Sequence, residues 1–211
     1  MNILIDELPI KIEVNNHIYS INANFKNCLR IMEAFEDNEL TNTEKIYIML
    51  DLLYEKMPED SDLEMATKQG IKFLDCGEEL NDEKRRFEEE YEIEEKSERL
   101  YSFKKDAKYI YSAIQQTHSI DLEQISFLHW WKFIYLFLDL NKDCFFSQML
   151  YLRKQKQKGK LSKEERITYY QMREILDLEY IPEDEREKSE FETLLEAGEK
   201  QWIKLQLQKV N

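Results

Sequence analysis

Glycine and proline are scarce in this sequence, with 4 Gly and 3 Pro among 211 residues. Because both residues mark tight turns and helix breaks, their scarcity favours helices joined by few tight loops. Four scattered glycines also exclude a glycine-rich phosphate-binding loop. Cysteine is rare and widely spaced, at Cys28, Cys76 and Cys144, with no Cys-x-x-Cys pair. This pattern predicts reduced thiols rather than a zinc knuckle or a disulfide framework.

Basic residues are also fewer than acidic ones. The chain has 30 Lys and Arg against 44 Asp and Glu, a formal net charge of −14. Proteins that bind nucleic acid or anionic membranes need cations, so we expect neither kind of partner. The N-terminal residues lack the basic start and long apolar run of a signal peptide, so none is expected, and no run of roughly 20 mostly apolar residues predicts a membrane span. The acidic balance suits a solubilising protein or one with a basic partner.

Alternating apolar residues near the N-terminus predict a β-hairpin. Ile12 and Val14 alternate with polar residues, Asn15-Asn16 can form a two-residue turn, and residues 17–21 continue as a second strand. Because an isolated hairpin is only marginally stable, we expect this one to pack on the helices that follow.

Helical spacing of apolar residues dominates the rest of the chain. The predicted fold class is therefore mainly α, a helical domain with a short N-terminal β-hairpin. Asp106 is expected to cap a helix, and the basic run 154–160 to form an exposed loop. The other predicted helix limits are Asn24 to Glu36, Thr43 to before Pro58, a Ser61-x-x-Glu64 capping box with a C-cap at Gly77, and a Ser162-x-x-Glu165 capping box.

The stretch from Ile120 to Leu140 is predicted as the central buried helix, because nearly every position after Leu122 is apolar or aromatic. Asp121 would be its N-cap. Polar residues at every third position would share one side of this helix and form its route to solvent or to a partner. These candidate partner-binding residues are Ser126, His129 and Lys132.

Changes in composition suggest four segments. Residues 1–77 hold the hairpin and first helices, 78–100 form a charged connecting helix or linker, 101–180 form a helical core, and 181–211 form a C-terminal helix; all could belong to one domain. Leu195 and Trp202 lie on a narrow apolar stripe of that last helix, which calls for a groove or partner helix. They complete the set of candidate partner contacts.

Motifs for catalysis or for binding a metal or cofactor are missing, so we expect a non-enzymatic protein without a cofactor. His129 has no second ligand at metal-binding spacing, and a structural role, such as bonding a backbone carbonyl, is favoured over catalysis. Trp130 and Trp131 point about 100° apart on a helix, so at least one should lie in the core.

A series of short motifs resembles a family of phage proteins. Phe103, Lys105-Asp106-Ala107 and Ile120-Asp121-Leu122 belong to it, and the most specific run is Leu128-His129-Trp130-Trp131-Lys132-Phe133. The family is similar to tail assembly chaperones of long-tailed phages and prophages of Gram-positive bacteria, encoded just ahead of the tape measure gene. Its signature here comprises Asp106, Asp121, Trp130, Trp131 and Phe133, and the resemblance covers roughly residues 8–180.

The resemblance implies a chaperone that binds the phage tape measure protein and keeps it soluble while tail tube subunits polymerise. Such a protein would act as a homo-oligomer on its client, in the cytoplasm of the bacterial host, and be absent from mature virions. Tail tube protein is a further expected partner. Two alternatives stay open: a structural tail component that remains in the virion, and a phage-encoded enzyme or host-modulating factor.

Overall fold

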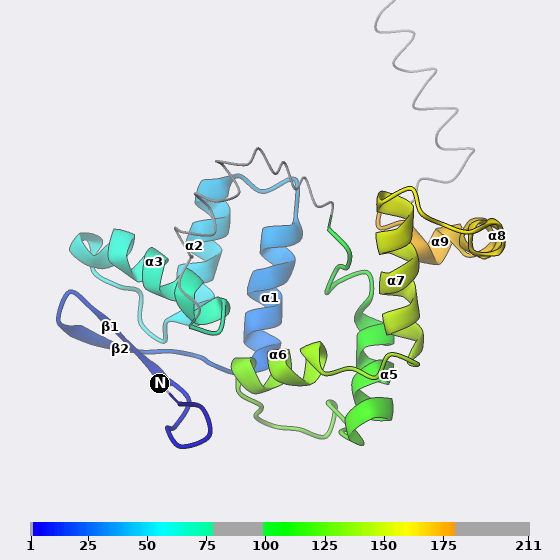
Figure 1. The fold of residues 1–211 in the computed structure, drawn as a ribbon. Helices are drawn as coiled ribbons and strands as arrows, with labels where there is room; N and C mark the ends of the chain where they lie inside the picture. The colour runs from blue at the N-terminus through cyan, green and yellow to red at the C-terminus, as the bar shows by residue number, and fades with distance from the viewer. Residues whose placement is uncertain (1, 78–98, 180–211) are drawn as a thin grey trace, which may run out of the picture. The chain divides into compact units, whose positions relative to one another are not determined.

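A two-residue turn closes the N-terminal hairpin. In the computed structural model, which describes residues 2–77 and 99–179, β1 (Lys11–Val14) pairs antiparallel with β2 (His17–Ser20) (Figure 1). Asn15 and Asn16 have φ of 48° and 67°, the left-handed backbone that such a turn requires and that Asn tolerates. The predicted hairpin is confirmed, and so is the mainly α fold class.

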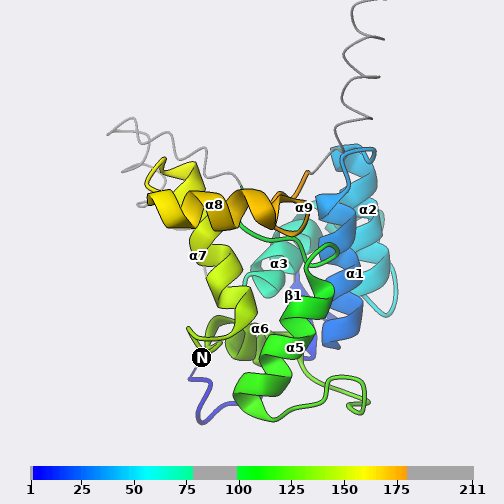
Figure 2. The same ribbon diagram turned by 90° about the vertical axis from the view of Figure 1, so that its right-hand side faces the viewer.

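Helices make up most of the remaining described chain (Figures 1 and 2). Contacts divide the protein into two units, Met1–Leu161 and Ser162–Asn211. The first unit contains α1 (Phe25–Glu36), α2 (Asn42–Leu53), the 3₁₀ turn η1 (Asp60–Asp62), α3 (Leu63–Leu74), α5 (Ala107–His118), α6 (Trp130–Leu138) and α7 (Phe145–Gln157). The second contains α8 (Lys163–Gln171) and α9 (Arg173–Leu176).

Side-chain caps explain where several helices begin. Asn24 accepts from the N–H of Lys26 at the start of α1, and Thr41 forms a capping box with Glu44 at the start of α2. The predicted Ser162–Glu165 box also forms, at α8. The box predicted at Ser61 was wrong, because Ser61 lies inside η1 and α3 starts at Leu63 without a side-chain cap.

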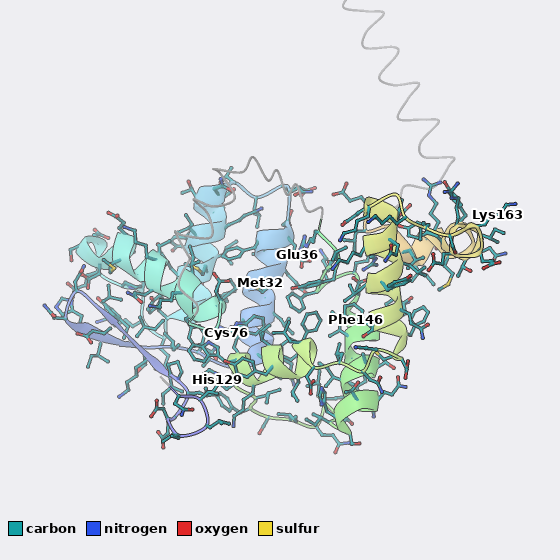
Figure 3. All side chains as sticks on the ribbon, viewed as in Figure 1. Met32, Glu36, Cys76, His129, Phe146 and Lys163 are labelled. Carbon is teal, nitrogen blue, oxygen red and sulfur yellow. The ribbon has the colours of Figure 1, made fainter. Side chains whose placement is uncertain are left out.

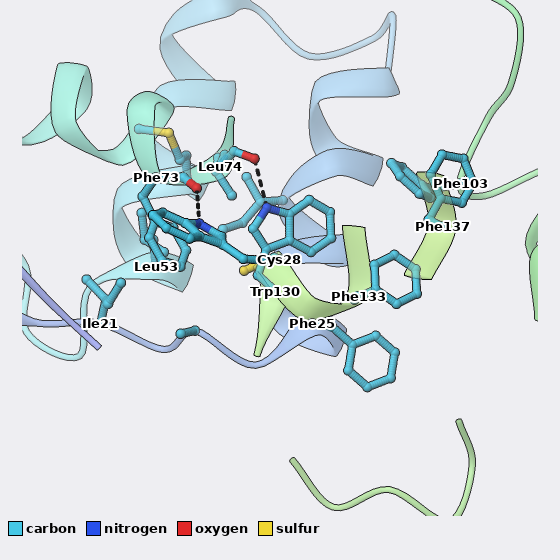
Figure 4. Close-up of a cluster of buried hydrophobic side chains, with 14 of the residues drawn as sticks. Ile21, Phe25, Cys28, Leu53, Phe73, Leu74, Phe103, Trp130, Phe133 and Phe137 are labelled. Carbon is cyan, nitrogen blue, oxygen red and sulfur yellow. Dashed lines mark hydrogen bonds between the residues drawn. The ribbon is translucent and has the colours of Figure 1, made fainter. Parts of the chain in front are cut away.

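Aromatic side chains from both halves of the first unit share one core (Figure 4). Phe133 of α6 stacks on Phe25 of α1 with ring centroids 5.1 Å apart, and on Trp130 at 5.7 Å. Phe103, from the segment that enters α5, contacts Phe133 and Phe137. Residues on both sides of the undescribed 78–98 segment therefore pack into the same core.

The predicted central helix is much shorter than the sequence suggested. Only Trp130–Leu138 is helical, and the residues before it form turns and an extended stretch. The reason is tertiary: the N–H of Trp130 donates to the carbonyl of Ala23, and the N–H of Phe25 donates to Leu128. Pairing with the chain ahead of α1 occupies groups that a longer helix would have used, so Asp121 is not the N-cap.

Asp106 also departs from its prediction. It stands at the N-terminus of α5 but makes no capping bond. Its carboxylate is fully buried and takes two hydrogen bonds from the Arg153 guanidinium on α7, at 2.7 and 2.9 Å, and a third from the N–H of Ser102. Asp106 therefore joins α5 to α7 rather than ending α5.

Glu36 makes a second polar link between distant segments (Figure 3). At the end of α1 it accepts from the hydroxyl of Ser102 at 2.6 Å and the N–H of Phe103 at 3.0 Å, and it pairs with Arg99. The chain that re-enters the described structure at residue 99 is thereby tied to α1.

The basic run 154–160 is a loop only in part. Helix α7 continues to Gln157, and Gly159, with φ of 63°, follows its end. The N–H of Gly159 donates to the carbonyl of Lys156, and the N–H of Lys160 donates to the carbonyl of Gln155. The prediction of a loop starting at Lys154 was wrong, because α7 extends through four of its residues. Most of the predicted charged connection and the predicted C-terminal helix, with Leu195 and Trp202, lie outside the described residues.

The Asp106–Arg153 pair gives a prediction about stability. Asp106→Ala should lower the free energy of unfolding by about 3–5 kcal/mol, because it leaves a buried guanidinium without its counter-charge. Asp106→Leu combined with Arg153→Met should recover most of that loss. Urea unfolding followed by circular dichroism measures both. Lys68→Ala, in the exposed Lys68–Glu64 pair, is the matched control and should cost at most about 0.5 kcal/mol. Equal losses for Asp106→Ala and this control would contradict the prediction.

Candidate functional site

The most distinctive part of the sequence, His129 to Phe133, builds the start of α6. His129 is the N-cap residue, and its Nδ1 accepts a hydrogen bond from the N–H of Trp131 at 3.1 Å. Its Nε2 lies 2.9 Å from the carbonyl oxygen of Pro9 and donates to it, since Nδ1 is already an acceptor. Burial lowers the pKa of His129, which favours the neutral ring that this arrangement requires. The imidazole thus joins the N-terminal segment to α6, the structural role expected for it.

Both tryptophans of the run are buried and bind the end of α3. Trp130 Nε1 donates to the carbonyl of Leu74 at 2.8 Å, and Trp131 Nε1 donates to Phe73 at 2.7 Å (Figure 4). A helix leaves its last carbonyls without partners inside the helix. Here, indole N–H groups from α6 serve that purpose.

The backbone after α3 curls back through a left-handed residue. Cys76 has φ of 59°, and the N–H groups of Cys76 and Gly77 donate to Phe73 and Lys72, which is the Schellman pattern. Gly77, with φ of 79°, lies against Trp131: a Cβ at position 77 would stand 2.9 Å from Trp131 Cη2. Glycine is favoured there both by the positive φ and by the close contact with Trp131. The C-cap residue is Asp75, two positions before the predicted Gly77.

A groove of about 550 Å³ runs between β1 and α3. Residues of β1, including Lys11 and Glu13, line one side, and Met65 and Gln69 of α3 line the other, with Trp131 also in the lining. The family-like motif therefore contributes to a surface feature as well as to the core.

Asp62 fixes the hairpin beside this groove. Its carboxylate accepts from Asn15 Nδ2 at 3.0 Å and Tyr19 Oη at 2.7 Å, and pairs with His17 Nδ1 at 2.7 Å. These three hydrogen bonds, with that from His17 the largest contributor, lower the pKa of Asp62 to about 2, and the carboxylate raises the pKa of His17. Nothing in the sequence spacing marked this cluster, because Asp62 lies more than 40 residues beyond its partners.

Three predicted partner-binding residues do not share a helix face. Ser126 lies in the loop before α6, His129 is its buried N-cap, and Lys132 is exposed in its first turn. The shared face was wrong because the helix starts later than predicted. Ser126 and Lys132 remain accessible, and their role in binding stays a prediction.

Exposed apolar side chains gather at a place that sequence reasoning missed. A turn closed by bonds from the N–H groups of Ile5 and Asp6 to the carbonyl of Asn2 presents Ile3, Leu4 and Ile5. Leu4 and Ile5 are 91% and 80% exposed. Three consecutive apolar residues bracketed by the turn formers Asn2 and Asp6 were the available signal.

The polar clusters of the described residues contain no group of three or more His, Cys, Asp or Glu side chains able to hold a metal ion. No disulfide involves Cys28, Cys76 or Cys144, and burial raises the pKa of Cys28 to about 12. No helix in this part of the chain is long and apolar enough to cross a membrane.

Comparison with known protein families identifies the family of this chain. The model of the Bacteriophage Gp15 protein family matches residues 4–178, which include the hairpin, the Asp62 cluster and the tryptophan pair. The chain belongs to the bacteriophage Gp15 protein family. No curated protein and no solved structure matches it significantly. The predicted membership of a phage family is confirmed, and the described contacts show how the His129–Phe133 run connects α6 to α3 and to the N-terminal segment.

Gly77→Ala tests the contact between Gly77 and Trp131. The substitution should destabilise the protein by roughly 1–2 kcal/mol for the left-handed backbone and a further 1–3 kcal/mol for the steric clash. Gly159→Ala is the matched control: its φ is also positive, at 63°, but a Cβ there meets nothing within 4 Å. It should cost only the backbone part. Chemical denaturation of both variants measures the difference. Equal losses of unfolding free energy would show that the Trp131 side chain moves aside without cost.

The Asp62–His17 pair predicts a dependence of stability on pH. The pKa of His17 is raised above 6.5 in the fold, so its contribution is complete below pH 6.5 and is lost as pH rises through the raised pKa. The pKa of Asp62 is lowered from 3.8 to about 2, so its contribution is present above about pH 4 and lost as pH falls through about 2. The coupling free energy between His17→Gln and Asp62→Asn should therefore be largest between about pH 4 and 6.5.

A double-mutant cycle by urea unfolding at pH 5, 6.5 and 9 measures this coupling. It should decline between pH 6.5 and 9 as His17 loses its charge. A coupling that is constant or rises over this range would show that the ionised pair does not hold the hairpin.

Proposed function

We propose that this Gp15 family protein is a tail assembly chaperone, which binds the phage tape measure protein and keeps it soluble until the tail tube assembles. The observation that carries the proposal is the family match over residues 4–178. That range contains the Leu128–Phe133 run on which the resemblance to tail assembly chaperones rests. The role needs binding without catalysis, in the cytoplasm of the host, and the protein would leave before the virion is complete.

Exposed apolar side chains support a binding role. A tape measure protein is a long helical chain, and its apolar stripes need apolar surfaces that can be covered reversibly. The turn carrying Leu4 and Ile5 offers such a surface, held in shape by a 2.6 Å hydrogen bond from the N–H of Asn2 to Asp6. On α6 and α7, Leu138 and Tyr151 are 73% and 51% exposed.

Electrostatics supports the same role. With a net charge of −14, a bound copy adds strong negative charge to its client. Complexes that carry like net charge repel one another, so coating an apolar chain with this protein opposes its aggregation. Basic segments of the client would be attracted first.

Co-expression with the tape measure protein of the same phage tests the proposal. The tape measure protein should move from the pellet to the soluble fraction and co-purify with this chain. If it stays insoluble and unbound while this chain is folded, the chaperone role fails for this form of the protein. Mass spectrometry of purified virions then decides the structural alternative, since a tail component would be present at a stoichiometric level.

Variants locate the contact once binding is seen. Leu4→Asp combined with Ile5→Asp should weaken client binding by more than about tenfold, because burial of each side chain contributes roughly 1.5–3 kcal/mol. Tyr47→Asp is the control, at an exposed α2 side chain (62% exposed). Leu195→Glu and Trp202→Glu test the C-terminal stripe in the same assay. A variant that stays folded and still solubilises the client excludes its surface as the contact.

A further inference from the structure

The outer edge of β1 carries main-chain groups without partners among the described residues. Hydrogen bonding alternates along an antiparallel pair. The N–H of Ile21 donates to the carbonyl of Ile10, and Ile12 and Val14 stand opposite Tyr19 and His17. These positions direct their backbone toward β2, so the N–H and C=O groups of Lys11 and Glu13 point away from the hairpin.

Space lies beside this edge. The groove beside β1 is lined by Lys11, Ile12 and Glu13 on one side and by Met65 and Gln69 of α3 on the other, so open space separates this part of the edge from α3. Lys11 and Glu13 are exposed, and no described residue bonds their side chains. An open strand edge is a template for another strand. A two-stranded hairpin also gains stability when it becomes part of a larger sheet.

The edge is complementary to itself. When two copies of β1 run antiparallel with Ile12 opposite Ile12, Lys11 of each copy stands opposite Glu13 of the other. Both positions direct their backbone outward, so the two opposed pairs form four main-chain hydrogen bonds. Each pair also places opposite charges directly across from one another, which stabilises a sheet.

Neighbouring registers lack this match. A shift of two residues in one direction places Glu13 opposite Glu13, and a shift in the other direction places Lys11 opposite Lys11. The latter also sets Pro9, which has no N–H, opposite Glu13. A shift of one residue brings outward backbone groups against inward ones and forms no ladder. One register therefore satisfies hydrogen bonds and charges together.

We propose that β1 is a self-association edge, at which a second copy of this chain pairs to form a four-stranded antiparallel sheet centred on Ile12. The local charge of the β1 edge affects whether two copies of this acidic protein can approach each other. Two molecules of net charge −14 repel one another, whereas this edge carries one Lys and one Glu and is locally neutral. The self-pairing is independent of the proposed client, since it is measured on the chain alone.

Charge-reversal variants of this chain test the pairing between two copies of β1. Sedimentation equilibrium should show a dimer of the native chain, with dissociation constants raised about tenfold or more by Lys11→Glu or Glu13→Lys alone, because each creates like-charge pairs. The double reversal should restore the native constant to within about threefold. A mixture of the two single variants should form heterodimers, because their edges are then fully complementary. Lys104→Glu, an exposed reversal elsewhere, should change little.

Glu13→Pro tests the main-chain bonds separately. It removes an N–H that points away from β2, so the hairpin keeps its ladder, while two of the four bonds between copies are lost. Circular dichroism melting confirms that each variant is folded. Dimerisation should be abolished or weakened about as strongly as by the charge reversals.

Three results would overturn the proposal. One is a native chain that stays monomeric at all concentrations reached, and another is a dimer indifferent to Glu13→Pro and to charge reversal. The third is a monomeric chain whose capture of the tape measure protein falls with Glu13→Pro. That result would assign the edge to an extended segment of the client instead, and the chaperone role would survive it.

Discussion

Two indole N–H groups hold the first unit together. Trp130 and Trp131 donate to the last carbonyls of α3, 56 and 58 residues away in the chain. This contact also affects other parts of the unit. It requires a glycine at position 77 because Trp131 lies where a Cβ would be, and it brings the aromatic core against α1. Helix α3 in turn carries the wall of the groove beside β1.

Buried polar groups in this protein connect distant segments of the chain. His129 joins the N-terminal segment to α6, Asp62 joins the hairpin to η1, and Asp106 joins α5 to α7. Every buried side-chain nitrogen and oxygen atom of the described residues has a hydrogen-bond partner. A satisfied network of this kind costs little and favours one arrangement of the segments over others, since each displaced group would lose its partner in a medium of low dielectric constant.

The exposed apolar turn around Leu4 and the open edge of β1 suit the proposed assembly role. A chaperone for a long helical chain needs apolar contacts that are accessible in the free protein, and the turn around Leu4 supplies side chains of that kind. It also needs many copies along one client. Pairing through β1 would link two copies without using the apolar turn, so self-association and client binding would occupy separate surfaces. Multivalent attachment of this kind raises avidity without any new contact to the client.

The amino-acid sequence by itself determined the fold class, the hairpin with its Asn15-Asn16 turn, most helix positions and the burial of at least one of Trp130 and Trp131, because these follow from spacing and turn chemistry within a few residues. It also carried the phage family resemblance. It did not reveal the shortened α6, the Asp62 cluster or the role of Asp106. Those depend on partners such as Arg153, 47 residues from Asp106, or Ala23, far ahead of Trp130. Only the tertiary structure decided them, since a buried polar group takes whichever distant partner packing brings within hydrogen-bond distance, and local spacing does not encode that distance.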